Sequence, residues 1–423
     1  MNAQSFFRSM IQSQKQGEAA GICSVCSAHP MVIEAAMEYA LEHDRPLLLE
    51  ATANQINQLG GYMGMIPSEF RDIVFGIADK VGLPRASLIL GGDHLGPIIW
   101  NGENEETAMP MAEELVRSFA SAGFSKIHLD TSMHLADDDS NIPLPVEVIA
   151  RRAALLCKAA EQSADELPVY VIGSEVPPPG GATENEEVLQ VTAVQDLRET
   201  IQSFENAFRE ENLMDAWKRV IAVVVQPGVE FSDNTVTLYN RKNAEGLTKY
   251  IREIDSLVLE GHSTDYQPGG LLSQMKEDGI AILKVGPELT FALREALFAL
   301  EKTERELYAI EPEGGWSGFA ASLDEAMLEN PVYWSKHYHG SAEETVMQRK
   351  YSLSDRCRYY LSNPGAEAAL EKLRENLKRE IPLGLLMQYM PEQAKDVISG
   401  KINPDFDSLV KARVKDVIDK YEK

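Results

Sequence analysis

Histidines and acidic residues gather directly after short apolar runs of this sequence. Asp93 and His94 follow the run SLILGG, His262 follows SLVLEG, and Glu175 follows PVYVIGS. Imidazole and carboxylate groups are the ligands that Zn²⁺ and similar divalent ions take in proteins. We therefore predict a metal site formed by His94, Glu175 and His262, with one position left open for a substrate. Asp93, beside the proposed ligand His94, can turn toward that substrate as a general acid or base.

Four further polar residues lie at the ends of apolar runs: His128, Asp130, Gln226 and Glu260. A single histidine at such a position is more often a satisfied core residue than a functional one. Several such positions, each with a histidine or an acid, favour a functional site, because buried charges are costly without partners or a metal. We take His128 and Asp130 as additional candidate catalytic groups, and Glu175 as the second candidate, after Asp93, for moving the proton.

Glycine-rich turns and one lysine offer contacts for a phosphate group. Gly286 precedes a helical segment whose N-terminus favours anions, and Lys284 lies two residues before it. The candidate substrate or phosphate contacts are Glu50, Asn54, Gly60, Gly61, Ser263, Thr264, Lys284 and Gly286. The sequence contains neither G-x-x-x-x-G-K-[ST] nor G-x-G-x-x-G, so we expect no nucleotide cofactor.

The elements that must position these residues follow from hydrophobic periodicity. Short β-rich runs alternate with longer amphipathic stretches, which is typical of a parallel sheet with crossover helices. The predicted strands are 19–25, 46–51, 87–92, 125–130, 168–174, 220–226, 256–261 and 280–286. The predicted helices are 31–43, 68–80, 107–122, 147–163, 192–210, 243–253, 269–277 and 288–308. Eight such pairs favour a closed (β/α)₈ TIM barrel over an open doubly wound sheet, with the active site at the carboxyl ends of the strands.

A barrel of this kind needs about 250 residues, so part of the chain lies outside it. We assign residues 1–310 to the barrel with its active site. Residues 311–423 contain only helical periodicity and loops, and we assign them to a C-terminal helical extension.

One segment of the extension, YSLSDRCRYY (351–360), combines two arginines with two serines in an otherwise acidic chain. Arginine suits bidentate recognition of phosphate. We predict that Arg356, or its neighbours Ser354 and Arg358, reaches back to the barrel mouth and contacts a substrate phosphate. The alternative is an amphipathic helix with its arginines on the surface.

The composition excludes several classes of partner. The chain has 423 residues, a net charge of −26 and a pI near 4.7, so its field repels nucleic acid. No apolar run approaches the roughly 18 residues of a membrane-spanning helix. The polar start lacks the features of a signal peptide, so we expect a cytoplasmic protein.

Four cysteines make no disulfide framework. Cys23 and Cys26 form a C-x-x-C, which is either half of a zinc site, a redox pair or two small buried residues at a strand end. We favour the last of these, because no second C-x-x-C follows.

Nine segments carry a resemblance to a known family. They are GICSVCSAHP (21–30), EATANQINQLGGYMGM (50–65), GGDHLGP (91–97), AGFSKIHLD (122–130), VIGSEVPPPGG (171–181), VVVQPGVEF (223–231), EGHSTDYQ (260–267), AILKVGPELTFALREALFAL (281–300) and YSLSDRCRYY (351–360). Over nearly its whole length the chain resembles the GatZ/KbaZ family. That family is similar to class II fructose- and tagatose-bisphosphate aldolases.

The resemblance implies roles for particular residues. Asp93 and His94 match the acid/base and metal-ligand pair of the aldolases, and Glu175 matches their glutamate turn. The turn KVGPEL (284–289) resembles the phosphate-side turn before the last barrel helix.

Two departures from the aldolase pattern concern the metal ligands. Gln226 stands where the aldolases place a metal-binding histidine, and a neutral amide binds metal more weakly than imidazole. After the seventh strand, either Glu260 or His262 is the ligand. These departures put ordinary aldolase catalysis by this chain in doubt.

The resemblance implies two functions, both with phosphorylated ketohexoses and a divalent metal, for which we expect Zn²⁺ before Mn²⁺, Ni²⁺, Co²⁺ or Mg²⁺. One is epimerisation at C4 between tagatose 6-phosphate and fructose 6-phosphate. The other is a subunit that stabilises and activates a class II tagatose-1,6-bisphosphate aldolase in galactitol, N-acetylgalactosamine or tagatose catabolism. We also expect a homo-oligomer.

Chemistry favours the epimerase. A ketone at C2 does not acidify the C4 hydrogen, and the sequence has no nicotinamide-binding motif. Epimerisation therefore requires retro-aldol cleavage of the C3–C4 bond and recombination on the other aldehyde face, which is the work of aldolase groups.

Overall fold

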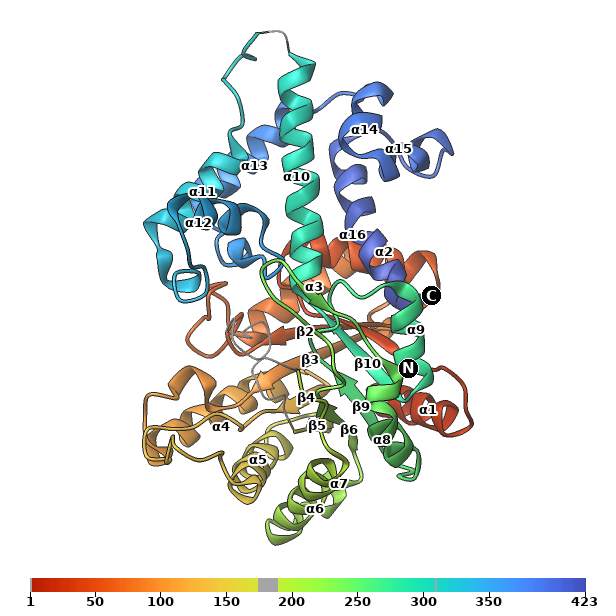
Figure 1. Cartoon of the computed structure of the whole chain (residues 1–423), viewed down its shortest axis with the longest axis vertical. Coiled ribbons are helices and arrows are strands. Elements are labelled where there is room, and N and C mark those ends of the chain that lie inside the picture. Colours follow the sequence, from red (N-terminus) through yellow and green to blue (C-terminus); the bar gives the residue numbers. More distant parts are fainter. Residues whose placement is uncertain (1, 174–188, 309) are drawn as a thin grey trace.

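The computed structural model describes residues 2–173, 189–308 and 310–423, and its centre is a closed barrel of eight parallel strands (Figure 1). The strands are β1 (Ile22–Val25), β2 (Leu47–Thr52), β3 (Leu88–Leu95), β4 (Lys126–Leu129), β5 (Val169–Ile172), β6 (Val220–Val225), β9 (Val258–Gly261) and β10 (Ile280–Val285). They follow one another around the barrel, and β1 pairs with β10 to close it. The predicted (β/α)₈ barrel is confirmed.

A helix follows each strand and covers its outer face. These helices are α2 (Pro30–Glu42), α3 (Pro67–Val81), α4 (Glu105–Ser121), α5 (Val146–Glu161), α6 (Val194–Glu210), α8 (Arg241–Arg252), α9 (Gly269–Glu277) and α10 (Pro287–Leu307). Because a barrel strand is buried on both faces, its sequence is an almost continuous apolar run. Strand β6, VIAVVV, is buried at every residue.

Several short elements lie outside the predicted pattern. Helix α1 (Ala3–Lys15) precedes the barrel, α7 (Met214–Trp217) precedes β6, and β7 (Glu230–Phe231) pairs with β8 (Val236–Thr237) in a hairpin. The buried side chains Phe7, Met10 and Ile11 of α1 pack in one cluster with apolar side chains of the barrel interior. Helix α1 thus closes the amino-terminal end of the barrel.

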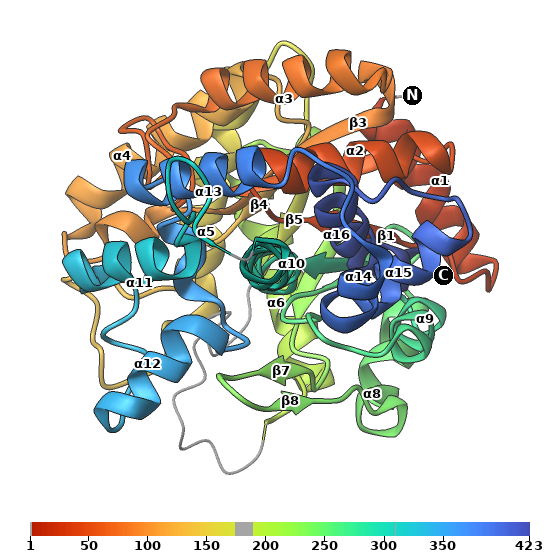
Figure 2. The same cartoon turned by 90° about the horizontal axis from the view of Figure 1, so that it is seen from above.

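The C-terminal region is helical, as predicted. After α10 come α11 (Phe319–Glu329), α12 (Ala342–Tyr351), α13 (Pro364–Asn376), α14 (Leu383–Tyr389), α15 (Pro391–Ile398) and α16 (Phe406–Glu422). Seen along α10, helices α11 to α13 lie on one side of it and α14 to α16 on the other (Figure 2).

Helix α16 returns to the barrel and packs against α2 and α10. Its last turn reaches the strands: the Tyr421 hydroxyl donates to the Thr264 carbonyl at 2.8 Å, and the Cys23 amide donates to Glu422 Oε1 at 3.2 Å. The end of the helical region is therefore part of the barrel wall.

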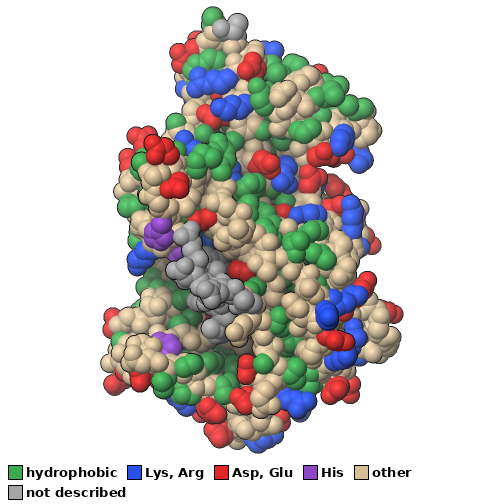
Figure 3. All heavy atoms as spheres, viewed as in Figure 1, with side chains coloured by type: hydrophobic (Ala, Val, Ile, Leu, Met, Phe, Trp, Pro, Cys, Tyr) green, Lys and Arg blue, Asp and Glu red, His purple; other side chains and the backbone are tan. Residues whose placement is uncertain are grey.

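Charges are mixed on the surface. On the face shown in Figure 3, Lys and Arg side chains stand next to Asp and Glu side chains. Within the described residues, no helix combines the length and the apolar character that a bilayer crossing requires.

Candidate active site

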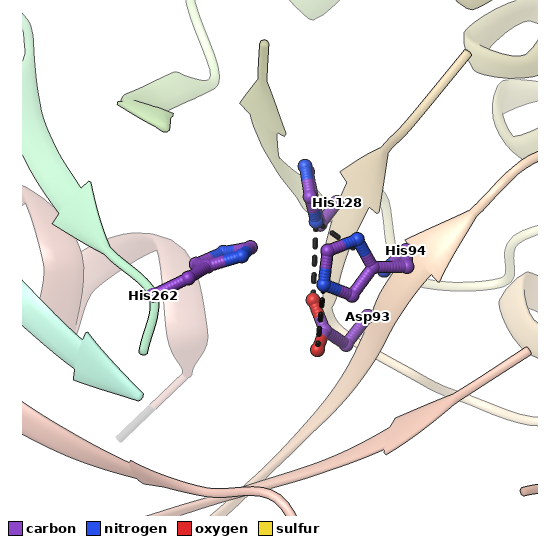
Figure 4. Close-up of side chains that lie close together, drawn as sticks. All are labelled: Asp93, His94, His128 and His262. Carbon is purple, nitrogen blue, oxygen red and sulfur yellow. Dashed lines mark hydrogen bonds and ion pairs between the residues drawn. The ribbon is translucent and has the colours of Figure 1, made fainter. Parts of the chain in front are cut away.

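Four side chains converge at the carboxyl end of the barrel: Asp93, His94, His128 and His262 (Figure 4). Each offers one donor atom, and all four atoms lie within 4.8 Å of one another. The three imidazole rings meet edge to face, with centroids 4.8 to 5.3 Å apart. The residues come from β3, from β4 and from the loop after β9, so the closed barrel is what brings them together.

An irregularity at the end of β3 lets two adjacent residues face one site. Neighbouring side chains of a regular strand point to opposite faces. Here the register with β4 shifts between Gly92 and Leu95, and His94 has a left-handed φ of 50°. Two residues further on, a Cβ at Gly96 would lie 1.6 Å from the Asp130 carbonyl oxygen. Glycine at that position permits the close approach of β3 to β4 that lets Asp93 and His94 both face the site.

A buried carboxylate orients His94. Its Nδ1 lies 2.7 Å from Asp130 Oδ2, so Nδ1–H donates to the carboxylate and leaves Nε2 for a proton or a metal ion. A carboxylate behind a histidine is the usual support of a metal ligand. Burial lowers the pKa of His94, but the charges of Asp93 and Asp130 outweigh it and raise the pKa above its ordinary value.

His262 has the same kind of support. Its Nε2 lies 3.0 Å from Glu260 Oε1, so Nε2–H donates to Glu260 and Nδ1 carries the lone pair. Burial lowers the pKa of His262 to about 3, which keeps the ring neutral at physiological pH. A neutral imidazole is the form that binds metal.

His128 is held differently, because both of its ring nitrogens have backbone partners. Nε2–H donates to the Gly173 carbonyl at 2.8 Å, and Nδ1 lies 3.2 Å from the amide nitrogen of His94. Nδ1 also lies 3.1 Å from Asp93 Oδ1. These contacts suit His128 to fixing the backbone of His94 more than to binding a metal.

A network of buried charges lies directly beneath the four side chains. Lys126, with 0% of its side chain exposed, contacts Glu50 at 2.7 Å and Glu260 at 2.9 Å. Lys284 contacts Glu50 at 3.1 Å and Asp93 at 2.5 Å. A Cβ at residue 91 would lie 2.6 Å from Glu50 Cγ, so Gly91 leaves the room that the Glu50 carboxylate occupies.

The network keeps Asp93 ionised. Burial pushes the pKa of Asp93 up, but the positive charges of His94 and Lys284 hold it well below the ordinary value. Oδ1 is the oxygen that contacts Lys284 and His128, whereas Oδ2 lies 3.7 Å from His94 Nε2. Asp93 thus presents Oδ2 as a fixed carboxylate at the site.

The residues present fit a divalent metal ion. A metal bound at His94 would take the place of the proton that its raised pKa favours, and the described carboxylates of Asp93, Asp130, Glu50 and Glu260 would then face the ammonium groups of Lys126 and Lys284. One divalent cation would balance the remaining charge. The lone pairs on His94 Nε2 and His262 Nδ1 are the donors that would hold it.

The placement of the other proposed metal ligands differs from the expectation. Glu260 contacts both lysines and the candidate ligand His262, so its place is behind that ligand. Gln226 accepts the amides of Gly228 and Val229 with its side-chain oxygen, the only Gln atom that could bind a metal. Glu175 lies outside the described residues.

Two expected phosphate contacts are used by the protein itself. The amides of Gly286 and Glu288 donate to Asp265 Oδ1 at 3.0 and 2.8 Å, so a carboxylate already occupies the N-terminus of α10. Lys284 is committed to the buried acids. The expected phosphate site at the Gly286 turn is filled because Asp265, in the loop after β9, lies beside that turn.

The remaining candidates divide into those inside and those outside the site. Ser263 is buried at a φ of 50°, and its Oγ has no hydrogen-bond partner among the described residues, so it stays a candidate contact. Thr264 Oγ1 donates to the Lys284 carbonyl. Gly60 and Gly61 donate their amides to Asn57, and Asn54 is exposed.

A cavity lies on the side of β1 and β2. It encloses about 410 Å³ and is lined by Cys26, Gln55, Tyr62 and Arg358, among others. Cys26 Sγ lies 3.5 Å from Ser24 Oγ, which donates to Glu50 of the buried network. The cavity therefore lies next to the acids and lysines of the barrel interior.

The segment 351–360 reaches this cavity through Arg358 and not through Arg356. Arg356 donates to the Tyr333 carbonyl, and Ser354 bonds to Asp233. Arg358 donates to the Ser354 carbonyl at 2.5 Å and to the Tyr359 hydroxyl at 3.1 Å. Within the described ranges it forms no ion pair with a carboxylate.

Sequence reasoning missed Lys126. It lies two residues before His128 in β4, so the alternation of the strand points both into the barrel. A lysine inside an apolar run is the signal that could have revealed the buried network.

The comparisons with known proteins agree with the expected family. A family model described as D-tagatose-1,6-bisphosphate aldolase subunit GatZ/KbaZ-like matches residues 7–423. The chain is 48% identical to D-tagatose-1,6-bisphosphate aldolase subunit GatZ of Salmonella paratyphi B and 46% identical to that of Escherichia coli O6:H1, over 98% of both chains in each case.

A solved structure supports the same relationship. The crystal structure of a probable tagatose 6 phosphate kinase from Sinorhizobium meliloti superposes with a TM-score of 0.88 at 43% identity, covering 95% of this chain and 99% of that one. The resemblance inferred from the nine motifs is therefore confirmed, and the chain belongs to the GatZ/KbaZ-like family of D-tagatose-1,6-bisphosphate aldolase subunits.

Proposed function

We propose that this chain is a metal-dependent component of a tagatose-1,6-bisphosphate aldolase and that its own barrel binds a phosphorylated ketohexose. The names of its relatives support the first part. The converging set of Asp93, His94 and His262 supports the second. A subunit that only stabilised a partner would have no physical need of this arrangement.

The single observation that carries the proposal is the state of Asp93. Its carboxylate is buried, ionised and fixed by Lys284 at 2.5 Å, with Oδ2 facing the site. A carboxylate so placed can accept the proton of the ketohexose 4-hydroxyl, after which the C3–C4 bond breaks and its electron pair moves toward the C2 carbonyl. The same group returns the proton when the bond forms again.

A divalent ion held by His94 and His262 would supply Lewis acidity for the carbonyl oxygen. Asp130 and Glu260 keep the two imidazoles in the tautomers that expose their lone pairs. His128 fixes the His94 backbone beside them.

We place the substrate phosphate in the cavity lined by Arg358. The guanidinium lies among Tyr62, Tyr359 and backbone carbonyls and forms no direct ion pair in the described part of the chain, although Glu367 and Glu371 also line the cavity. In a chain of net charge −26, a cation in such a position favours an anionic ligand. Ser263 Oγ, buried without a partner among the described residues, is a candidate hydrogen-bond partner for the sugar.

The second candidate function is the epimerisation of tagatose 6-phosphate and fructose 6-phosphate at C4 by this chain alone. The observation that favours it is that one barrel contains both the base Asp93 and the candidate metal-binding pair. Retro-aldol cleavage followed by rotation of the aldehyde requires no further group type.

One experiment tests both functions. The purified, Zn²⁺-loaded chain is incubated with fructose 6-phosphate and, separately, with tagatose 1,6-bisphosphate, with and without a class II aldolase catalytic subunit. If the chain is an aldolase component, we expect it to raise bisphosphate cleavage by the catalytic subunit, and Asp93→Asn to diminish that effect. Tagatose 6-phosphate formed by the chain alone would establish the epimerase.

An aldolase rate that the wild-type chain and Asp93→Asn raise equally would contradict the proposed role of this barrel. No reaction on any of these substrates, together with no binding of fructose 6-phosphate, would contradict the substrate class.

A further inference from the structure

Gln226 lies at the level of the site on the inward-facing side of the barrel. Within β6 and β9, Val224 pairs with Glu260 and Val225 with Gly261. Glu260 points into the barrel, where it contacts Lys126. Paired residues of parallel strands share a face and alternate along it, so Gln226 follows Val224 inward at the level of His262. Only 2% of Gln226 is exposed.

The orientation of the Gln226 amide is fixed by its neighbours. Oε1 accepts the amide of Gly228 at 2.8 Å and that of Val229 at 3.0 Å. A backbone N–H can only donate, so the oxygen must be the atom that faces these two groups. The backbone of Gln226 is held as well, because its N–H donates to Thr192 Oγ1 and its carbonyl accepts the Thr192 amide, both at 2.9 Å.

The other end of the same amide is unsatisfied. Nε2 is buried and has no hydrogen-bond partner among the described residues. A buried donor without a partner costs about 1–3 kcal/mol, and such groups are rare in native proteins. A rotation of the amide would not relieve this cost, because it would turn Nε2 toward the two backbone N–H groups.

We propose that Gln226 binds the substrate, and that its Nε2–H groups donate to an oxygen of the ketohexose phosphate at the barrel mouth. This inference rests on the proposed function, from which it takes the substrate class. An amide nitrogen has no lone pair to offer a cation, and the amide oxygen is occupied. Gln226 is therefore a substrate contact and not the metal ligand that its place in the sequence suggested.

The chemistry of the contact follows from the donor. Two N–H groups recognise a carbonyl, hydroxyl or alkoxide oxygen and disfavour a ligand that lacks an oxygen there, because Nε2 then remains buried without a partner. Gln226 would thus select for an oxygenated carbon of the sugar close to His262.

Two substitutions test the inference by separating shape from hydrogen bonding. Gln226→Glu keeps an oxygen for Gly228 and Val229 but replaces the donor with an acceptor. Gln226→Met keeps the volume of the side chain and removes both the acceptor oxygen and the donor N–H groups. Metal affinity is measured with Zn²⁺ alone, and binding of fructose 6-phosphate is measured by calorimetry on the metal-loaded protein.

We expect Gln226→Met, which adds no charge, to retain the Zn²⁺ affinity of the wild type, and we expect both variants to bind fructose 6-phosphate about 10- to 100-fold more weakly, as the loss of one buried hydrogen bond implies. Gln226→Glu controls for folding, since it preserves the contacts of Oε1, and thermal unfolding of each variant checks this directly.

Three results would overturn the inference. If Zn²⁺ affinity falls tenfold in Gln226→Met, Gln226 acts on the metal, and the proposed function still stands. If fructose 6-phosphate binds both folded variants as tightly as it binds the wild type, Gln226 makes no substrate contact. If the wild type binds no ketohexose phosphate, the proposed function fails and the inference fails with it.

Discussion

The two ends of the barrel are built from the same eight strands and differ completely in chemistry. At the amino-terminal end, inward side chains such as Leu48, Val169 and Ile282 are apolar, and Phe7 of α1 packs among them. Two or more residues further along the same strands, Glu50 and Lys284 are buried charges. The first end is sealed and electrically neutral, whereas the second is held together by ion pairs and, in the described residues, carries excess negative charge.

This difference suggests that the amino-terminal end of the barrel contributes mainly to stability and the carboxyl end mainly to function. Apolar burial favours folding without regard to any ligand. Buried ion pairs contribute little net stability, because their attraction is offset by the cost of desolvation. The charged end is therefore explained better by what it binds than by what it adds to the fold, and substitutions at the two ends should have opposite consequences.

The largest effect is expected at the charged end, from Asp93→Asn. The amide keeps the shape of the side chain and removes its basicity, so we expect turnover in the assays described above to fall about 10²- to 10⁴-fold, the usual worth of a positioned acid or base. Zn²⁺ content should be unchanged, since the imidazoles supply the proposed donors. Undiminished turnover would transfer the role of base to another carboxylate.

At the sealed end, Phe7→Ala should lower the free energy of unfolding by about 3–5 kcal/mol, because it opens a cavity in a cluster where Phe7 is 0% exposed. Zn²⁺ affinity should stay that of the wild type. Phe6, its partly exposed neighbour, provides the matched control: Phe6→Ala should cost clearly less. Equal losses in the two variants, measured by denaturant unfolding, would show that α1 does not seal the barrel as described.

In contrast to Phe7→Ala, His94→Ala should lower Zn²⁺ affinity and leave the free energy of unfolding nearly unchanged. Removing a proposed direct ligand should lower Zn²⁺ affinity by at least about 10- to 100-fold, the range seen when groups behind a ligand are changed. Competition with a chromogenic chelator measures this. A Zn²⁺ affinity equal to that of the wild type would place the metal elsewhere.

The smallest effect concerns pH, through Asp265 at the boundary between the site and α10. Burial raises the pKa of Asp265 from 3.8 to about 7. In the native state this carboxyl holds its proton between about pH 4 and 7, where the unfolded chain has lost it, so its contribution to stability falls as the pH rises through that window.

Asp265→Asn removes this titration and keeps an oxygen for the amides of Gly286 and Glu288. Relative to wild type, the variant should gain stability between pH 5 and pH 8 by at least about 1.4 kcal/mol, the value of one pKa unit. Unfolding of both proteins at the two pH values measures it, and a difference that does not change with pH would refute the shift.

Local pattern was sufficient to predict the barrel and the convergence of His94, His128 and His262, because alternation and strand ends are properties of short segments. It could not predict the irregularity that turns both Asp93 and His94 inward, which depends on Gly96 packing against Asp130. Nor could it assign partners: Lys284 meets Asp93, and Asp265 takes the N-terminus of α10, only after the barrel closes. Helix α1 was missed because its apolar face is covered by strands far along the chain.

Helix α16 joins the two ends of the chain at the seam of the barrel. It packs against α2, α10 and β1, across the seam where β1 meets β10. The contacts that hold it span 399 residues between Cys23 and Glu422 and 377 between Arg45 and Glu422. Folding slows as the sequence separation of native contacts grows. We therefore expect the seam to close late in folding. Because Tyr421 donates to the Thr264 carbonyl, we expect the loop that contains His262 to become ordered only at that stage.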